Sequence, residues 1–162
     1  MPFTPLHMGP GIAIKAALRR RFSLMVFGWS QIVMHLQPLF VMLTDKGDIH
    51  GFSHTVLGAT LLGLAAALSG KPLGELGLRL LREPAHLPIT WPVSFLSACI
   101  GTYSHVLIDS IMHSDIAPFA PWRGGSPQHG VISIDTLHLL CVATAVVGGA
   151  VYYLPHRTES HG

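Results

Sequence analysis

The chain has 162 residues, of which 49% are hydrophobic and 11% are charged. An ordinary soluble domain has roughly 25% charged residues, so this balance indicates a membrane protein, and the length suits one domain covering residues 1–162. The formal net charge is +2, with cations scattered or at helix ends. This distribution argues against a nucleic-acid-binding surface, and no nucleic-acid partner is expected.

The N-terminal third of the chain predicts a short helix followed by a membrane span. Residues 1–11 are rich in Pro and Gly, which opposes a long helix, and a short helix is expected at residues 12–21. The apolar segment 22–43 is long enough to cross roughly 30 Å of hydrocarbon. It follows a basic run, as a signal peptide would, but no A-x-A-like cleavage site is visible, which favours an uncleaved helix.

Three further apolar segments complete the predicted fold. Residues 54–69 form a short Gly- and Ala-rich span, and the leucines within the connection 71–92 have the spacing of a helix lying along the membrane surface. Spans are also expected at 91–113 and 131–154, separated by a loop and followed by a polar, mobile tail. The predicted fold class is all-α: an integral membrane bundle of about four transmembrane helices with a short N-terminal helix.

The distribution of basic residues predicts the orientation of this bundle. The N-terminal region, the second connection and the C-terminal tail carry Lys15, Arg19, Arg20, Arg21, Lys71, Arg79, Arg82 and Arg157. The other two loops carry only Lys46 and Arg123. The positive-inside rule then places both termini in the cytoplasm, so the expected protein is multi-pass, N-in and C-in, with its histidine-bearing loops outside.

A candidate metal site lies in the motif Y-S-H-V-L-I-D-S-I-M-H-S-D. His105, Asp109 and His113 are spaced at i, i+4 and i+8, and each step of four advances only about 40° around a helix. The three side chains therefore share one stripe, and Asp115 follows where the helix is expected to end. Imidazole and carboxylate are ligands for Zn²⁺, Mn²⁺ or Fe²⁺. The alternative is a buried His–Asp pair that only ties two helices together.

A second motif, H-G-F-S-H, places His50 in a loop and His54 at the start of the next span, with Ser53 as its expected N-cap. Its alternative is a pair of solvated loop histidines.

The depths of several polar groups within the spans also agree. Measured from the outer helix ends, these groups lie about 6 to 12 Å deep, which predicts a polar shaft open to the outer face. The groups in the shaft are His35, His105, His138, Asp109 and Asp135. Asp135 and His138 are either outer partners of the ligands or a core pair.

The two histidine motifs, a histidine near the N-terminus and a Pro-rich loop ending in P-W together resemble the bacterial inner-membrane metal-dependent hydrolases of the YdjM type. The resemblance implies a membrane-embedded hydrolase in the bacterial inner membrane, with metal ligands at His7, His50, His54, His105 and Asp109.

Two features depart from the family pattern. Members often carry an acidic residue before a proline in the first span, where this chain has M-H-L-Q-P, so His35 either replaces that carboxylate or leaves one metal position weakened. The charge rule also puts His7 on the cytoplasmic side. Either the segment 12–21 is a re-entrant half-helix that returns His7 to the cavity, or His7 is not a ligand.

The expected chemistry is hydrolysis by a metal-activated water, with zinc the first choice of ion and Mn or Fe the alternatives. Asp115 or His113 is the expected general base. A looser likeness of H-x-x-x-D to zinc-dependent phospholipase C favours a phosphoester or lipid substrate taken from the bilayer.

The rival function is metal or proton handling without bond cleavage, and a third possibility is a structural protein with a decayed site. The nearly apolar segments 92–101 and 139–154 favour a blind cavity, and hence an enzyme, over a conduction path.

Overall fold

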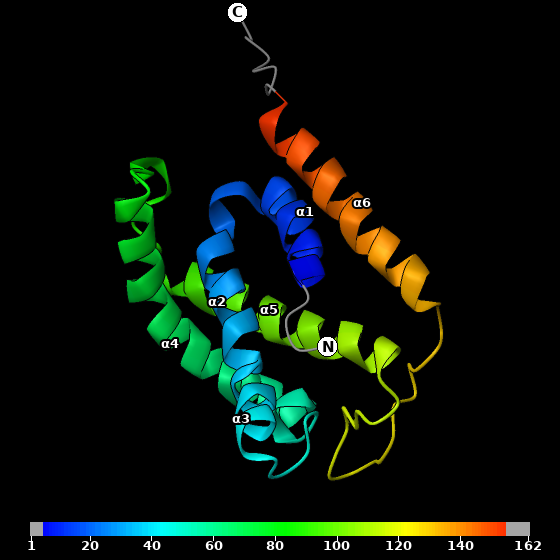
Figure 1. The fold of residues 1–162 in the computed structure, drawn as a ribbon. Helices are drawn as coiled ribbons and strands as arrows, with labels where there is room; N and C mark the ends of the chain where they lie inside the picture. The colour runs from blue at the N-terminus through cyan, green and yellow to red at the C-terminus, as the bar shows by residue number, and fades with distance from the viewer. Residues whose placement is uncertain (1–4, 155–162) are drawn as a thin grey trace, which may run out of the picture.

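The computed structural model describes residues 5–154, and all the secondary structure in this range is helical (Figure 1). Four helical stretches are long and apolar enough to cross a membrane, which confirms the predicted fold class and indicates a membrane protein. The predicted mobile tail, including His156, Arg157 and His161, lies outside the described residues. In chain order the helices are α1 (Met8–Leu18), α2 (Leu24–Met34), α3 (Leu36–Thr44), α4 (Val56–Leu80), α5 (Trp91–Met112) and α6 (Ile134–Tyr153).

The first candidate span, Leu24–Thr44, is broken at His35 into α2 and α3. Pro38 lacks the amide hydrogen that would bond the carbonyl of Met34 in a continuous helix. The His35 amide instead donates to the Ile32 carbonyl at 3.0 Å, in a tighter turn. The break leaves the His35 side chain buried in the bundle, with only 7% of the residue exposed.

Helix α4 extends to Leu80, so the prediction that the span ends at residue 69 and that a separate surface helix follows was wrong. Polar side chains near the C-terminal end of α4 form hydrogen bonds with other residues of the protein. Glu75 accepts hydrogen bonds from Lys71 at 2.6 Å and from the Ile89 amide at 3.1 Å. Gly74 lets Ile89 and α2 approach closely, because an added Cβ would lie 3.1 Å from the Ile89 Cδ1 atom. These contacts stabilise the part of the helix that follows Pro72.

Helix α1 begins at Met8 rather than at residue 12, because two early glycines lie where neighbouring helices touch it. A Cβ at Gly9 would overlap the Cys141 carbonyl of α6, and a Cβ at Gly11 would overlap the Phe27 ring of α2. Glycine inside a helix costs about 1 kcal/mol relative to alanine, but it permits this close approach of backbones. The small residues that argued against a helix in the sequence are therefore packing residues.

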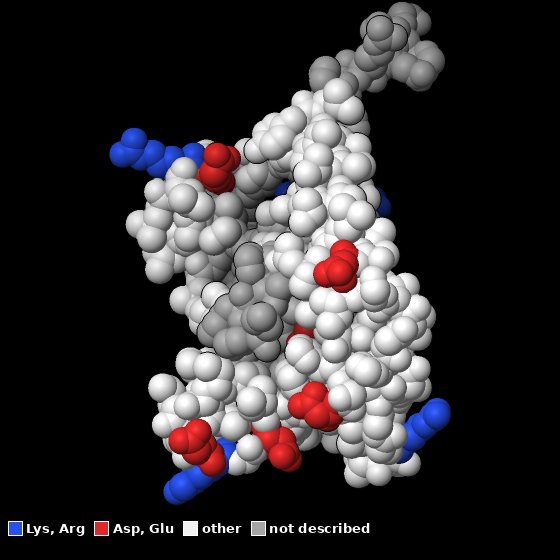
Figure 2. Space-filling model, turned by 45° about the vertical axis from the view of Figure 1, so that its right-hand side comes forward, with Lys and Arg blue, Asp and Glu red and all other residues white. Residues whose placement is uncertain are grey.

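The main core lies between α2, α4 and α5, and its buried residues are Val26, Val33, Ala66, Ala67, Leu78, Ile89 and Ala98. Helix α6 packs mainly against α1 and is the most exposed of the four candidate spans. Arg19, at the C-terminal end of α1, joins these two helices by donating to the Val151 and Tyr152 carbonyls at 3.1 and 2.7 Å. The visible Lys and Arg side chains lie toward the two ends of the molecule, with mostly uncharged surface between them (Figure 2).

The contact between α1 and α6 gives a test of this packing. An added Cβ at Gly148 would lie 2.5 Å from the Ala13 Cα atom, whereas a Cβ at Gly149 would meet nothing within 4 Å. We expect Gly148→Ala to lower the free energy of unfolding by about 1–3 kcal/mol, since overpacking forces the backbones apart. Thermal unfolding in detergent, with Gly149→Ala as the matched control, measures this difference. Equal stability of the two variants would contradict the close approach.

Candidate metal centre

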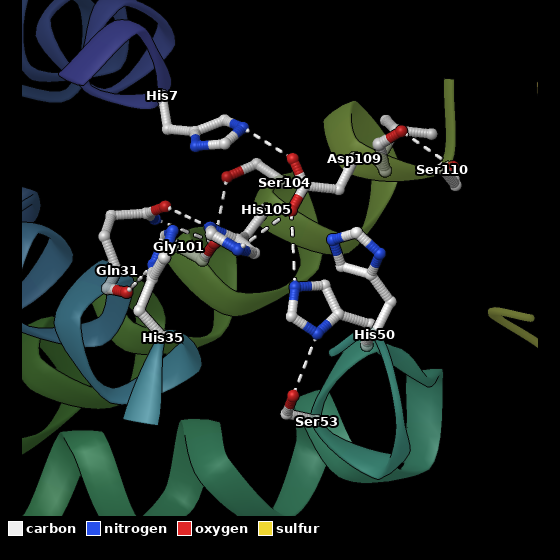
Figure 3. Close-up of polar contacts among 12 residues, drawn as sticks. His7, Gln31, His35, His50, Ser53, Gly101, Ser104, His105, Asp109 and Ser110 are labelled. Carbon is white, nitrogen blue, oxygen red and sulfur yellow. Dashed lines mark hydrogen bonds and ion pairs between the residues drawn. The ribbon is translucent and has the colours of Figure 1, made fainter. Parts of the chain in front are cut away.

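The buried carboxylate of Asp109 is the centre of a cluster of imidazoles (Figure 3). Its Oδ1 lies 3.0 Å from His7 Nε2. Its Oδ2 lies 3.3 Å from His54 Nε2 and 3.2 Å from His105 Nε2. The side chains of all four residues are at most 8% exposed. Three ring nitrogens therefore converge on the two oxygens of one carboxylate, away from bulk water.

Three separate segments bring these ligand types together. His105 and Asp109 are one turn apart on α5, as their spacing predicts. His7 ends the 3₁₀ turn that precedes α1, and His54 ends the 3₁₀ turn Phe52–His54 that precedes α4. The cluster thus joins three elements that are distant in the sequence.

The expectation that Ser53 caps the second span was wrong. The N-cap of α4 is Thr55, whose hydroxyl accepts from the Gly58 amide at 2.9 Å. The Ser53 hydroxyl instead lies 2.8 Å from His54 Nδ1, and its amide donates to Gln37 Oε1 at 2.7 Å. The Ser53 hydroxyl therefore orients the imidazole of His54 through its contact with Nδ1, and the Nε2 atom of His54 faces Asp109.

His7 lies in the cluster, at the start of a helix that is too short to be a full membrane span. Helix α1 has 11 residues and is about 16 Å long, roughly half the distance needed to cross a bilayer. It begins beside Asp109 and ends at the basic turn Arg19–Arg21. His7 can therefore reach the cluster while the basic residues lie at the end of the bundle.

Gln31 on α2 is a polar residue of the cluster that the sequence analysis did not single out. Its Nε2 donates to the Gly101 carbonyl at 3.0 Å, which fixes the amide so that Oε1 faces His105 Nδ1 at 2.8 Å. The carbonyl of Gln31 accepts from His35 Nδ1 at 2.8 Å. A polar residue four positions before a histidine in an apolar helix is the signal that could have identified it.

These hydrogen bonds fix the tautomer of His105. Because Gln31 Oε1 can only accept, the Nδ1 of His105 carries the proton and the neutral ring has a lone pair on Nε2. That lone pair faces a carboxylate oxygen, an arrangement that is repulsive unless a cation or a proton lies between them. The Nε2 atoms of His105 and His7 are both buried, and the polar group that each one faces is the Asp109 carboxylate.

The donor set fits a divalent metal ion. In tetrahedral sites, zinc bonds to nitrogen and oxygen of about 2.0–2.2 Å separate neighbouring ligand atoms by roughly 3.3–3.6 Å. The nitrogen-to-oxygen distances at Asp109, 3.0 to 3.3 Å, lie at or just below this range, so small side-chain shifts would admit an ion. Imidazoles oriented by an amide or hydroxyl behind them are also typical of metal ligands.

Gln31 gives a test of this arrangement. Gln31→Met removes the acceptor behind His105 at nearly constant volume, and we expect metal affinity to fall about 10–100-fold, as for other partners of ligating histidines. Gln31→Glu keeps an oxygen there and is expected to retain binding. Competition titration with a chromogenic chelator measures both. Equal affinities in the wild type and both variants would show that Gln31 does not position His105.

His35 lies next to the cluster at the edge of a narrow cavity. Its ring is centred 4.7 Å from the ring of His105. The cavity has a volume of about 60 Å³, and its lining includes His35, His50, His54 and Asp109. This is room for one or two small molecules such as water, in contact with candidate ligands.

At the outer side of this cavity, His50 connects the buried cluster to an exposed group. His50 Nδ1 lies 2.8 Å from Asp115 Oδ2, and the His50 ring is centred 4.4 Å from that of His113. Burial and the neighbouring His50 lower the pKa of His113. For Asp115, burial acts to raise the pKa, but the hydrogen bond from His50 outweighs it and the pKa is lowered. At neutral pH both groups are in their basic forms.

Three combinations within residues 5–154 have ligand atoms within 4.8 Å of one another: His7 with His105 and Asp109, His50 with His54 and Asp109, and His50 with His113 and Asp115. Buried His and Asp groups that can hold a metal ion are therefore present. Neither Asp135 nor His138 belongs to these combinations. Asp135 is exposed in the first turn of α6, and His138 is half-buried on the same helix. They lie apart because α6 packs mainly against α1 rather than against the helices of the cluster.

Comparisons of the chain with known protein families, with curated proteins and with solved structures give no match.

Proposed function

We propose that this chain is a metal-dependent hydrolase of the YdjM type, multi-pass in the bacterial inner membrane with both termini in the cytoplasm, acting on a phosphoester or lipid. The observation that carries the proposal is the convergence of three imidazole nitrogens on the buried Asp109 carboxylate, beside a cavity that leads to a second, exposed His–Asp group. Such ligands favour zinc, with manganese and iron as alternatives.

Each group has a role in this proposal. His7, His105 and Asp109 form one set that can hold an ion, His50 and His54 form a second set that shares Asp109, and His35 lies beside them. A divalent ion held by these residues would supply a water molecule of lowered pKa and would polarise a phosphoryl oxygen. His113, neutral because its pKa is lowered, accepts the proton of the attacking water. The Asp115 carboxylate holds the His50 ring, which stands between the exposed group and the cluster.

The arrangement of these groups also gives a substrate access to the buried cluster. The cluster is buried, but the Asp115 side chain is 63% exposed. A polar substrate group can therefore enter beside Asp115 and reach the narrow cavity, while the helices around the cluster exclude bulk water. Exclusion of water strengthens the electrostatic interactions of the carboxylate and of any bound ion with the substrate.

The test is hydrolysis by protein purified without chelators and loaded separately with zinc, manganese or iron. Phosphodiester, phosphomonoester and carboxylic ester substrates that release nitrophenol are compared. We expect turnover of at least one phosphoester by the loaded protein, and a loss of about 10²–10⁴-fold in His113→Gln, the usual contribution of a general base. Protein that binds metal stoichiometrically but cleaves none of these esters would reject the hydrolase and favour metal handling.

A further inference from the structure

An apolar groove lies along α2 and ends at the metal centre. Its volume is about 630 Å³. At one end its walls are His7, Gln31 and His35, and at the other they are Leu24, Met25 and Leu73. Gly28 and Trp29 line the middle. The groove therefore has one polar end, made by residues in or against the histidine cluster, and an apolar remainder.

The groove is the last of three cavities in a row. An outer cavity of about 760 Å³ is lined by residues that include His50 and Asp115. It shares His50 with the narrow cavity beside Asp109, and the narrow cavity shares His35 with the groove. The candidate ligands therefore lie between the exposed group on one side and the apolar groove on the other.

The length of the groove matches a single hydrocarbon chain. Leu24 and His35 are eleven residues apart, which is about 16 Å along a helix. This is close to half the roughly 30 Å thickness of the hydrocarbon region, which is the length occupied by the chains of one leaflet. The groove also lies within a candidate membrane span, Leu24–Thr44, where lipid chains are the surrounding solvent.

We propose that this groove binds a hydrocarbon chain of a membrane phosphoester lipid whose phosphate group reaches the metal centre. The proposal rests on the proposed function and specifies its substrate. A lipid chain is already in an apolar medium, so moving it into the groove gains little hydrophobic free energy. The groove instead orients the substrate, and the affinity comes from the phosphate at the cluster. An apolar channel on this side also gives no path for ions.

Gly28 provides a way to close the groove. A Cβ added there meets only Met8, at 3.5 Å or more, so a larger side chain fits without backbone strain and projects into the groove. Gly149 on α6 has nothing within 4 Å of an added Cβ. Gly28→Leu and Gly149→Leu therefore add the same side chain to two membrane helices, but only the first obstructs the proposed site.

The experiment uses hexadecyl phosphate with a photoreactive diazirine at the chain end, added to zinc-loaded full-length protein in phosphatidylcholine nanodiscs. Labelled positions are mapped by mass spectrometry. We expect labelling to concentrate at residues 24–29 and at Leu73, to fall at least fivefold in Gly28→Leu and to be unchanged in Gly149→Leu. Unlabelled hexadecyl phosphate should compete at least tenfold better than hexadecanol, because only the phosphate binds at the centre.

Labelling spread over the lipid-facing helices, or labelling at α2 that Gly28→Leu does not reduce, would overturn the proposal, as would equal competition by hexadecanol. The readout does not require turnover. Specific labelling in a protein that cleaves no ester would keep the lipid site and reject the hydrolase. Hydrolysis of soluble phosphoesters without specific labelling would support the hydrolase and reject the lipid site.

Discussion

Replacing Asp109 with Ala is expected to abolish metal binding. Both carboxylate oxygens face imidazole nitrogens at 3.0 to 3.3 Å, so the substitution removes the one group that all three histidines share. The loss should exceed the about 10–100-fold effect of removing an outer partner of a ligand. Elemental mass spectrometry on detergent-purified protein should find near-stoichiometric metal in the wild type and background levels in the variant.

Asp135→Ala is the matched control for this measurement. It also removes a carboxylate from an apolar helix, but Asp135 is exposed in the first turn of α6 and belongs to none of the three candidate ligand groups in residues 5–154. Its metal content should equal that of the wild type. A wild-type protein that stays metal-free after purification without chelators and attempted reloading would contradict the metal centre and leave a hydrogen-bonded network.

Removing the metal is expected to lower the midpoint of thermal unfolding. An ion that binds only the folded state stabilises it by about 4.1 kcal/mol when its free concentration is 1,000 times the dissociation constant. For a chain of this size the midpoint should fall by about 8–16 °C when a chelator is added. Amide exchange should rise most in α1, because His7 at its start is the residue that joins this helix to Asp109.

The same scan on Asp109→Ala separates this effect from a general action of the ion or the chelator. The variant has lost the shared carboxylate, so its midpoint should not respond to zinc or to chelator. Adding zinc back to the stripped wild type should restore the original midpoint. An unfolding midpoint that is independent of metal in both proteins, despite measured metal binding, would show that the ion does not hold the three elements together.

Local regularities made part of this structure predictable from the sequence. The third span was expected at residues 91–113 and is Trp91–Met112, because bilayer thickness fixes the length of an apolar helix. The pairing of His105 with Asp109 followed from helical spacing. His50 and Asp115 were expected in or beside loops at the ends of their spans, and they form a hydrogen bond at 2.8 Å.

Contacts between distant segments account for what the sequence did not predict. Helix α4 continues to Leu80 because Glu75 receives the amide of Ile89, fourteen residues later. The role of Gln31 depends on Gly101 and His105, seventy or more residues away. His138 was expected at the depth of His105, but depth along a helix does not say which helices are neighbours.

The packing of α6 on α1 has a consequence for biosynthesis. Of the helices in residues 5–154, α6 is synthesised last, yet it packs mainly against α1, and Arg19 donates to a carbonyl near its end. Until α6 is inserted, α1 lacks most of its support, and His7 is not held against Asp109. A chain that stops before residue 134 would keep all five predicted metal ligands but lack the helix that keeps one of them in place. The centre is therefore expected to assemble only after α6 has been synthesised and inserted.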